Sequence, residues 1–266
     1  MGFLSKSRMR FAFIALSLLL TISMRAALAL PAGLVVDYTG NGTANDTTGT
    51  YNATFTGSYV AGMNGQQAFN LSNGNFSAPQ AELPSGASSR TMSFWINPQA
   101  DATAVYGGLG YGGSTYDSQF DLYYNTVANQ WSYYTSYWGA YQIAFNQTGW
   151  SFGGPTLTPG QWSYLAVTFN GSLVSIYLNG NLYVSSGLAG GANGTINTTV
   201  SSGTLNGLSA PEYLQNIHIY NTALTTTQIQ QDYQASLPEP SMLSLDLMAA
   251  MLVVVAVAPR RRNVTH

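Results

Sequence analysis

Residues 161–184 constrain the fold more than any other part of the chain. Residues 161–169 are rich in β-forming side chains, residues 173–178 alternate between apolar and polar, and Asn179-Gly180 then precedes Leu182-Tyr183-Val184. An Asn-Gly pair between two such runs is the strongest local signal for a hairpin, because both turn residues need a positive φ. The stretch therefore predicts three antiparallel strands joined by tight turns.

Similar short runs, separated by Gly, Asn and Ser, recur over residues 30–235, and residues 225–234 are the one plausible helix. This pattern predicts an all-β sandwich or barrel. Hydrophobic side chains make up 45% of the chain, which is enough for a core without disulfides, and there is no cysteine. Thiol chemistry and cysteine-based metal sites are therefore excluded. The glycine-rich residues 107–113 lack the lysine and helix start of a phosphate loop, so we expect a flexible loop there.

Charged side chains make up only 7% of the chain. Between residues 30 and 237, Arg90 is the one basic residue against eight acidic ones. A domain with this balance cannot neutralise phosphates, so nucleic acid is not an expected partner.

The N-terminus has the pattern of an export signal. A basic start precedes the apolar residues 11–24, and Ala27-Leu28-Ala29 supplies the small residues of a cleavage site. The apolar run is shorter than the roughly 20 residues that cross a bilayer. Residues 1–29 are therefore predicted to be a signal peptide that signal peptidase removes after Ala29, and the protein is predicted to be exported.

The C-terminus has three parts in a specific order: Pro238-Glu239-Pro240, the mostly apolar residues 242–258, and the cluster Arg260, Arg261 and Arg262. This order resembles the PEP-CTERM sorting signal, which an exosortase processes in Gram-negative bacteria that make exopolysaccharide. The resemblance implies a sorting tail over residues 236–266, with a transmembrane helix at 242–258. It also implies a place at the cell surface or in the extracellular matrix, with membrane anchoring before processing. A plain tail anchor is the alternative.

The middle of the chain carries a second resemblance. Residues 162–171 and 176–180 resemble the core hairpin of laminin-G-like, concanavalin A-like jelly rolls. Four further segments agree in order: residues 33–35, 46–54, 91–98 and 217–225. The resemblance implies a two-sheet antiparallel jelly roll over residues 30–235, with six or seven strands in each sheet and a concave face.

Members of that family often bind calcium through Asp-rich loops and an Asp pair just before the closing strand. The matching positions here are Gln215-Asn216 and Asn73-Gly74-Asn75, so Asp46 is the one acidic candidate ligand. Calcium takes six to eight oxygen ligands, some of which Asn and backbone carbonyls can supply. Calcium at Asp46 is therefore the one cofactor that the resemblance leaves open.

The chain lacks the residue arrangements that catalysis usually needs. Glycoside hydrolysis needs two carboxylates within about 10 Å, whereas Asp117 and Asp121, if on one strand, would lie roughly 13 Å apart. His218 is the only histidine before the tail, and alternation turns it away from the face of Ile217 and Ile219. We expect an ordinary surface or hydrogen-bonded histidine there, and no enzyme. A glycoside hydrolase or polysaccharide lyase remains the third hypothesis.

Residues 106–152 are rich in Tyr and Trp. Adjacent pairs such as Tyr133-Tyr134 cannot both face inward from a strand, so some of these rings are exposed. Exposed rings beside amides and hydroxyls suit neutral sugars. The candidate carbohydrate-binding residues are Tyr134, Tyr137, Trp138, Tyr141 and Trp150. The leading hypothesis is a non-catalytic domain that binds a neutral polysaccharide or surface glycan, and the second is a structural coat or biofilm protein that self-associates.

Overall fold

The computed structural model describes residues 28–72, 74–79, 83–99, 108–112, 119–125, 130–134, 155–187, 204–207 and 211–237. Within the chain, Ala29–Leu237 form one compact unit. No helix in the described ranges is long and apolar enough to cross a membrane. The predicted signal peptide, up to residue 27, and the whole tail from residue 238 lie outside the described residues.

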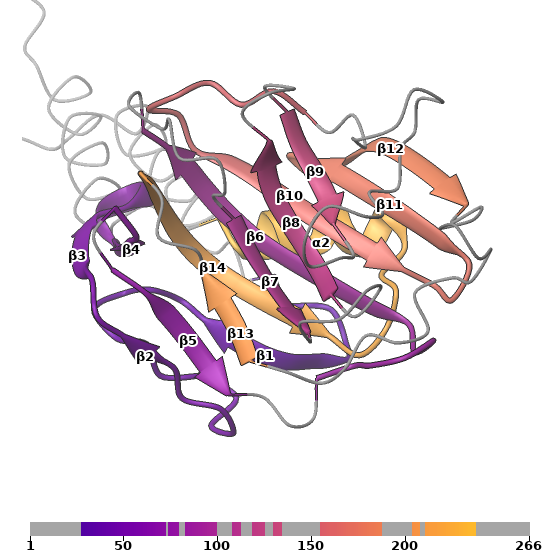
Figure 1. The fold of residues 1–266 in the computed structure, drawn as a ribbon, viewed down its shortest axis with the longest axis horizontal. Helices are drawn as coiled ribbons and strands as arrows, with labels where there is room; N and C mark the ends of the chain where they lie inside the picture. The colour runs from indigo at the N-terminus through magenta and orange to yellow at the C-terminus, as the bar shows by residue number, and fades with distance from the viewer. Residues whose placement is uncertain are drawn as a thin grey trace, which may run out of the picture. The chain divides into compact units, whose positions relative to one another are not determined.

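The compact unit is an all-β antiparallel sandwich, as the sequence predicted (Figure 1). In the described parts of the chain, one sheet has eight strands, in the order β12-β11-β10-β6-β14-β4-β3, with β1 also pairing with β14. The other has six, in the order β2-β5-β13-β7-β8-β9. The larger sheet therefore exceeds the six or seven strands that the family resemblance implied.

The strands of the eight-stranded sheet are β1 (Leu34–Tyr38), β3 (Ser58–Ala61), β4 (Gln67–Asn70), β6 (Arg90–Pro98), β10 (Ser163–Phe169), β11 (Leu173–Leu178), β12 (Asn181–Gly187) and β14 (Glu212–Tyr220). Those of the six-stranded sheet are β2 (Thr54–Phe55), β5 (Phe76–Pro79), β7 (Gly108–Gly112), β8 (Gln119–Asn125), β9 (Gln130–Tyr134) and β13 (Thr204–Gly207). A 3-10 turn, η1 (Met63–Gly65), and the helix α2 (Thr226–Ala235) complete the described elements.

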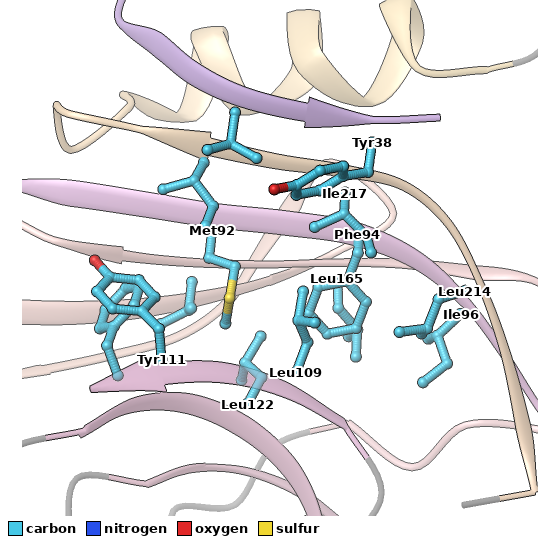
Figure 2. Close-up of a cluster of buried hydrophobic side chains, with 14 of the residues drawn as sticks. Tyr38, Met92, Phe94, Ile96, Leu109, Tyr111, Leu122, Leu165, Leu214 and Ile217 are labelled. Carbon is cyan, nitrogen blue, oxygen red and sulfur yellow. The ribbon is translucent and has the colours of Figure 1, made fainter. Parts of the chain in front are cut away.

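The main core lies between the two sheets. Because side chains alternate across a strand, every second residue of each sheet points into this space. Met92 and Phe94 of β6 and Leu165 of β10 face Leu109 of β7 and Leu122 of β8 (Figure 2). All five side chains are buried.

Helix α2 covers the outer face of the eight-stranded sheet. Thr225 and Gln228 form a capping box that fixes its start. Ile229 of the helix packs in a second apolar cluster with Trp95, Tyr164 and other residues of that outer face. In Figure 1 the helix lies behind the larger sheet and the smaller sheet lies in front. The predicted helix is thus confirmed, with its bounds shifted by one residue.

The predicted hairpin is confirmed: Asn179 and Gly180 turn between β11 and β12 with φ of 49° and 78°. The prediction of a flexible loop at residues 107–113 is wrong, because Gly108–Gly112 form β7, which pairs with β8 and β13. Burial of Leu109 and Tyr111 anchors the strand, so packing and pairing override the weak strand propensity of glycine.

Candidate functional site

One line of residues crosses all six strands of the smaller sheet. The register pairs Thr54 with Ser77, Ser77 with Asn206, Asn206 with Gly110, Gly110 with Asp121, and Asp121 with Tyr134. Directly opposed residues share a face of the sheet, at intervals of about 4.8 Å between strands. We call this line the polar row; its members are Thr54, Ser77, Asn206, Gly110, Asp121 and Tyr134.

The polar row lies on the outer face of the sandwich. Its sequence neighbours Phe76, Leu109 and Phe120 are buried in the core between the sheets. In Figure 2, Leu109 and Leu122 point toward the eight-stranded sheet. Since neighbours alternate faces, the row positions face the other way.

Asp121 is the acidic residue of the row, and Gly110 makes room for its side chain. A Cβ atom placed on Gly110 would come within 1.7 Å of Asp121 Oδ1, so the carboxyl lies across the bare backbone of β7. Burial raises the pKa of Asp121 well above its ordinary value, and a hydrogen bond from the Tyr111 backbone N–H offsets part of this rise. The Tyr111 N–H and the bare backbone at Gly110 thus define where this carboxyl lies.

The positions beside the row are also uncharged. On β7 the same face carries Gly108 and Gly112, on either side of Gly110. The register sets Gly108 opposite Tyr123, and Tyr123 opposite Ser132. Amide, hydroxyl and tyrosine positions surround a single carboxyl, with no lysine or arginine among the described positions of this face, and these groups match the hydrogen-bonding needs of a hydroxyl-rich, uncharged ligand.

Of the predicted carbohydrate-binding residues, Tyr134 ends β9 and belongs to the polar row. The other four, Tyr137, Trp138, Tyr141 and Trp150, lie outside the described residues. Asp117 also lies outside them, so the predicted Asp117–Asp121 spacing stays a prediction. Of the predicted processing residues, Ala29 is exposed and its carbonyl accepts a hydrogen bond from Gln231 Nε2 at 2.7 Å.

His218 faces away from Ile217 and Ile219, as predicted, and lies buried under α2. Asp232 of the helix is the centre of a polar network with the sheet. Its Oδ1 accepts hydrogen bonds from His218 Nδ1 at 2.7 Å and Tyr220 OH at 2.6 Å. Its Oδ2 accepts from Ser93 Oγ and Tyr164 OH, both at 2.5 Å. We call these five residues the helix lock.

Asp37 flanks the helix lock from β1, with Oδ1 at 3.4 Å from His218 Nε2. Burial by itself would lower the pKa of His218, but the charge and hydrogen bond of Asp232, joined by Asp37, raise it to about 10. The group is no catalytic triad, because Ser93 donates to Asp232 rather than to His218 and because His218 is only 3% exposed. It is a buried network of hydrogen bonds and an ion pair that holds the helix on the sheet.

The carboxyl oxygens of Asp46 are already engaged in hydrogen bonds, which leaves few oxygen ligands for calcium. Asp46 accepts hydrogen bonds from the backbone N–H groups of Asp37, Thr48, Thr50 and Tyr51, and from the Thr48 hydroxyl. These donors occupy both carboxyl oxygens, so Asp46 organises its own loop. In the described parts of the chain, no three His, Cys, Asp or Glu residues are grouped as a metal site requires.

The positions that match the family's calcium-binding Asp pair lie within β14 and not before it. Gln215 Oε1 accepts a hydrogen bond from the Met63 N–H, and Asn216 Nδ2 donates to the Ser236 carbonyl. Both amides therefore join the sheet to neighbouring segments. Calcium at Asp46 stays a prediction, and this geometry does not strengthen it.

The family is decided by a match over most of the sandwich. The model of the concanavalin A-like lectin/glucanases superfamily, in a laminin G type of domain, matches residues 70–230. The chain belongs to this superfamily. No curated protein matches the chain.

Solved structures of the same fold come from several kinds of protein. Domain 4 of AbnA, an extracellular GH43 arabinanase from Geobacillus stearothermophilus solved in complex with arabinotriose, is 18% identical, with a TM-score of 0.58; the match covers 75% of this chain and 98% of that domain. Trypanosoma rangeli sialidase is 17% identical (TM-score 0.54), with 86% of this chain and 38% of that one covered.

The binding domain of Paraclostridial Mosquitocidal Protein 1 is 16% identical, with a TM-score of 0.54, and the match covers 76% of this chain and 52% of that one. The chain thus spans about the length of the arabinanase domain, but only part of the sialidase and toxin chains. At these identities the likeness shows a shared fold.

Proposed function

We propose that this chain is a non-catalytic carbohydrate-binding domain that binds a neutral polysaccharide across the polar row. The observation that carries the proposal is the row itself, a line of hydroxyl, amide, carboxyl and tyrosine positions across six strands. The strand spacing of about 4.8 Å is close to the length of one sugar unit, so successive units can meet successive strands. The superfamily, and an arabinanase domain of the same fold solved with arabinotriose, support this function.

The placement of the described carboxyl groups supports binding without catalysis. Hydrolysis of a glycosidic bond needs two carboxyl groups that flank the same bond. Asp37 of β1 and Asp232 of α2 both lie beside His218, between the helix and the sheet, and Asp46 is enclosed by its loop. Glu212 is buried, with only 3% exposed. Among the described residues, Asp121 is therefore the single carboxyl on the outer face of the smaller sheet.

The sequence patterns at the two ends support a surface location for this binding. The signal-peptide pattern ending at Ala29 favours export, and the sorting-signal pattern from Pro238 to Arg262 favours passage through a membrane-bound exosortase. Exopolysaccharide would then be the polymer that surrounds the domain at the cell surface.

The proposal is tested by titrating Ala29–Leu237 with arabinotriose and with linear neutral polysaccharides such as arabinan, xylan and dextran, by calorimetry and affinity electrophoresis. We expect saturable binding to at least one polymer. Asp121→Ala and Tyr134→Ala should each weaken it about tenfold, a loss of ~1.4 kcal/mol. Chelator should leave the affinity unchanged if calcium takes no part.

Gln230→Ala, on the exposed side of α2, is the matched control and should bind like the wild type. Release of new reducing ends or unsaturated products during the titration would show an enzyme. Failure of the whole panel to bind would leave a structural role as the better account.

A further inference from the structure

Arg90 is the only lysine or arginine between residues 30 and 237, and its side chain points into the core. It begins β6, and alternation places it on the same face as Met92, which Figure 2 shows between the two sheets. Arg90 is 0% exposed. Its guanidinium carbon lies 4.9 Å from the centre of the Phe120 ring and 4.6 Å from that of Phe169. An aromatic ring from each sheet therefore contacts the buried cation.

The hydrogen bonds of Arg90 use one of its three guanidinium nitrogens. Nη1 donates to the carbonyl oxygens of Gly86 at 3.0 Å and Ser88 at 3.2 Å. Nε and Nη2 are buried and have no hydrogen-bond partner in the part of the chain that the structure describes. The N–H bonds of these two nitrogens lie along one edge of the planar guanidinium and form a fork. The two unsatisfied donors thus make up one complete binding edge.

No described carboxyl group neutralises this cation. Both ion pairs among the described residues belong to His218. The remaining described carboxyl groups accept backbone hydrogen bonds on other elements; they are those of Asp46, Asp121 and Glu212. Burial of a charge without a counter-charge is costly, and contacts with aromatic rings offset only part of the cost. An anion at the fork would remove the rest of it.

From these observations we propose that the fork of Arg90 binds one carboxylate group. The two oxygens of a carboxylate match the Nε and Nη2 donors in a bidentate pair. A carboxylate in such a pair lies in the guanidinium plane, so it preserves the contacts with Phe120 and Phe169 better than a tetrahedral sulfate or phosphate does. The acidic balance of the domain opposes a polyanion, which favours a ligand with a single carboxylate.

The carboxylate can come from two sources. One is a small ligand such as a uronic acid, which carries one carboxylate on an otherwise neutral, hydroxyl-rich ring. The other is the chain itself, whose remaining acidic residues before the tail, Glu82, Asp101 and Asp117, lie outside the described residues. The site is separate from the polar row, because Arg90 points between the sheets and the row lies on the outer face. Its test therefore does not depend on the proposed function.

The loop over residues 85–89 contacts Arg90 at this end of the sandwich. Its Ala87 and Ser88 are exposed, whereas the carbonyls of Gly86 and Ser88 contact Nη1. We expect a free ligand to reach the fork when this loop opens.

The Nε–H group of Arg90 reports on the fork directly, because Ala29–Leu237 contains no other arginine. Its NMR signal would be followed while sodium acetate or sodium glucuronate is added, with sodium chloride and glucose as the matched ionic and neutral controls. The proposal predicts a saturable downfield shift of the proton with both carboxylates. The expected dissociation constant is about 1 mM, as befits a ligand of few atoms, and neither control should shift the signal.

Arg90→Lys keeps the charge but has no fork, so calorimetry should show carboxylate affinity reduced at least about tenfold. If the chain supplies the carboxylate, the Nε–H signal of the wild type is shifted downfield before any addition, and added acetate changes nothing. One of the variants Glu82→Gln, Asp101→Asn and Asp117→Asn should then remove that shift.

An Nε–H signal that is unshifted in the free protein and does not respond to carboxylates would overturn the proposal. An equal response to chloride would also overturn it, as would acetate binding that Arg90→Lys leaves intact. Arg90→Lys should bind a neutral polysaccharide like the wild type. Loss of glycan binding on the polar row and loss of carboxylate binding at Arg90 are therefore measured separately.

Discussion

At the scale of single residues, Glu212 joins the two sheets close to the polar row. Its carboxyl accepts a hydrogen bond from the Gly108 N–H at 3.0 Å, although the two residues lie on different sheets. Burial raises the pKa of Glu212 from 4.5 to about 8, and this hydrogen bond offsets only part of the rise. Gly108 lies two residues from Gly110, so Glu212 contacts the strand that supports Asp121.

The raised pKa of Glu212 predicts a stability that falls as the pH rises. Between pH 4.5 and about 8 the folded state holds a proton that the unfolded state has lost, so the free energy of unfolding decreases over this window. Glu212→Gln cannot ionise and should be more stable than the wild type at pH 9 by about 2–4 kcal/mol, given ~1.4 kcal/mol per pKa unit. Near pH 4 the free energies of unfolding of the wild type and of Glu212→Gln should be similar.

Urea denaturation of both proteins at pH 4 and pH 9 measures this difference. The other titrating groups are common to both proteins, so their contributions cancel in the comparison. Equal stability at pH 9 would mean that Glu212 carries no buried charge there.

At the scale of elements, the helix lock determines how α2 is held on the sheet. Burial alone would raise the pKa of Asp232, but the charge of His218 and four hydrogen bonds keep it below 3.8. The contribution of Asp232 to the free energy of unfolding is present above pH 3.8 and is lost as the pH falls through the lowered pKa of the folded state. The contribution of His218 is complete below its unfolded pKa of 6.5 and is lost as the pH rises through about 10.

Asp232→Ala should therefore destabilise the protein by about 3–5 kcal/mol at neutral pH, because it leaves the charge of His218 buried without its main partner. Asp232→Asn should cost less, since an amide oxygen still accepts hydrogen bonds. Thermal and urea unfolding between pH 3 and pH 11 should show the largest loss at intermediate pH. Gln230→Ala on the same helix should change the free energy of unfolding little. If Asp232→Ala destabilises the protein no more than this control does, the helix lock does not stabilise the fold.

Elements set by local pattern were predicted well. Alternation and turn chemistry predicted the β11–β12 hairpin, the helix α2 and the face of His218, because each depends on residues close in sequence. The partners of His218 were not predictable: Asp37 lies on β1 and Asp232 on α2, and only the packing of helix on sheet unites them. The one signal for these partners was a polar residue at the outward position between Ile217 and Ile219.

The polar row was predictable only in part. Alternation predicted that one residue of the pair Tyr133-Tyr134 faces outward, whereas the strand β7 was mistaken for a loop because its sequence is glycine-rich. Glycine at position 110 is explained only by the carboxyl of Asp121, which arrives from the neighbouring strand. A cross-strand contact of this kind depends on register, which composition and local pattern do not reveal.

At the scale of the whole molecule, the two outer faces of the sandwich differ in chemistry. The outer face of the larger sheet is occupied by α2 and the helix lock. The outer face of the smaller sheet carries the polar row, and the edge at β12 carries exposed apolar residues. This division assigns stability to one face, and our proposed function places ligand binding on the other.

The location of the bound glycan tests the central claim most directly. Backbone amide signals of Ala29–Leu237 would be followed by NMR while the polysaccharide that binds best is added. The account predicts that the largest shifts fall on Gly110, Asp121 and Tyr134 and on their neighbours in β7, β8 and β9, with α2 (Thr226–Ala235) unchanged. Shifts confined to α2 or to the eight-stranded sheet would contradict it.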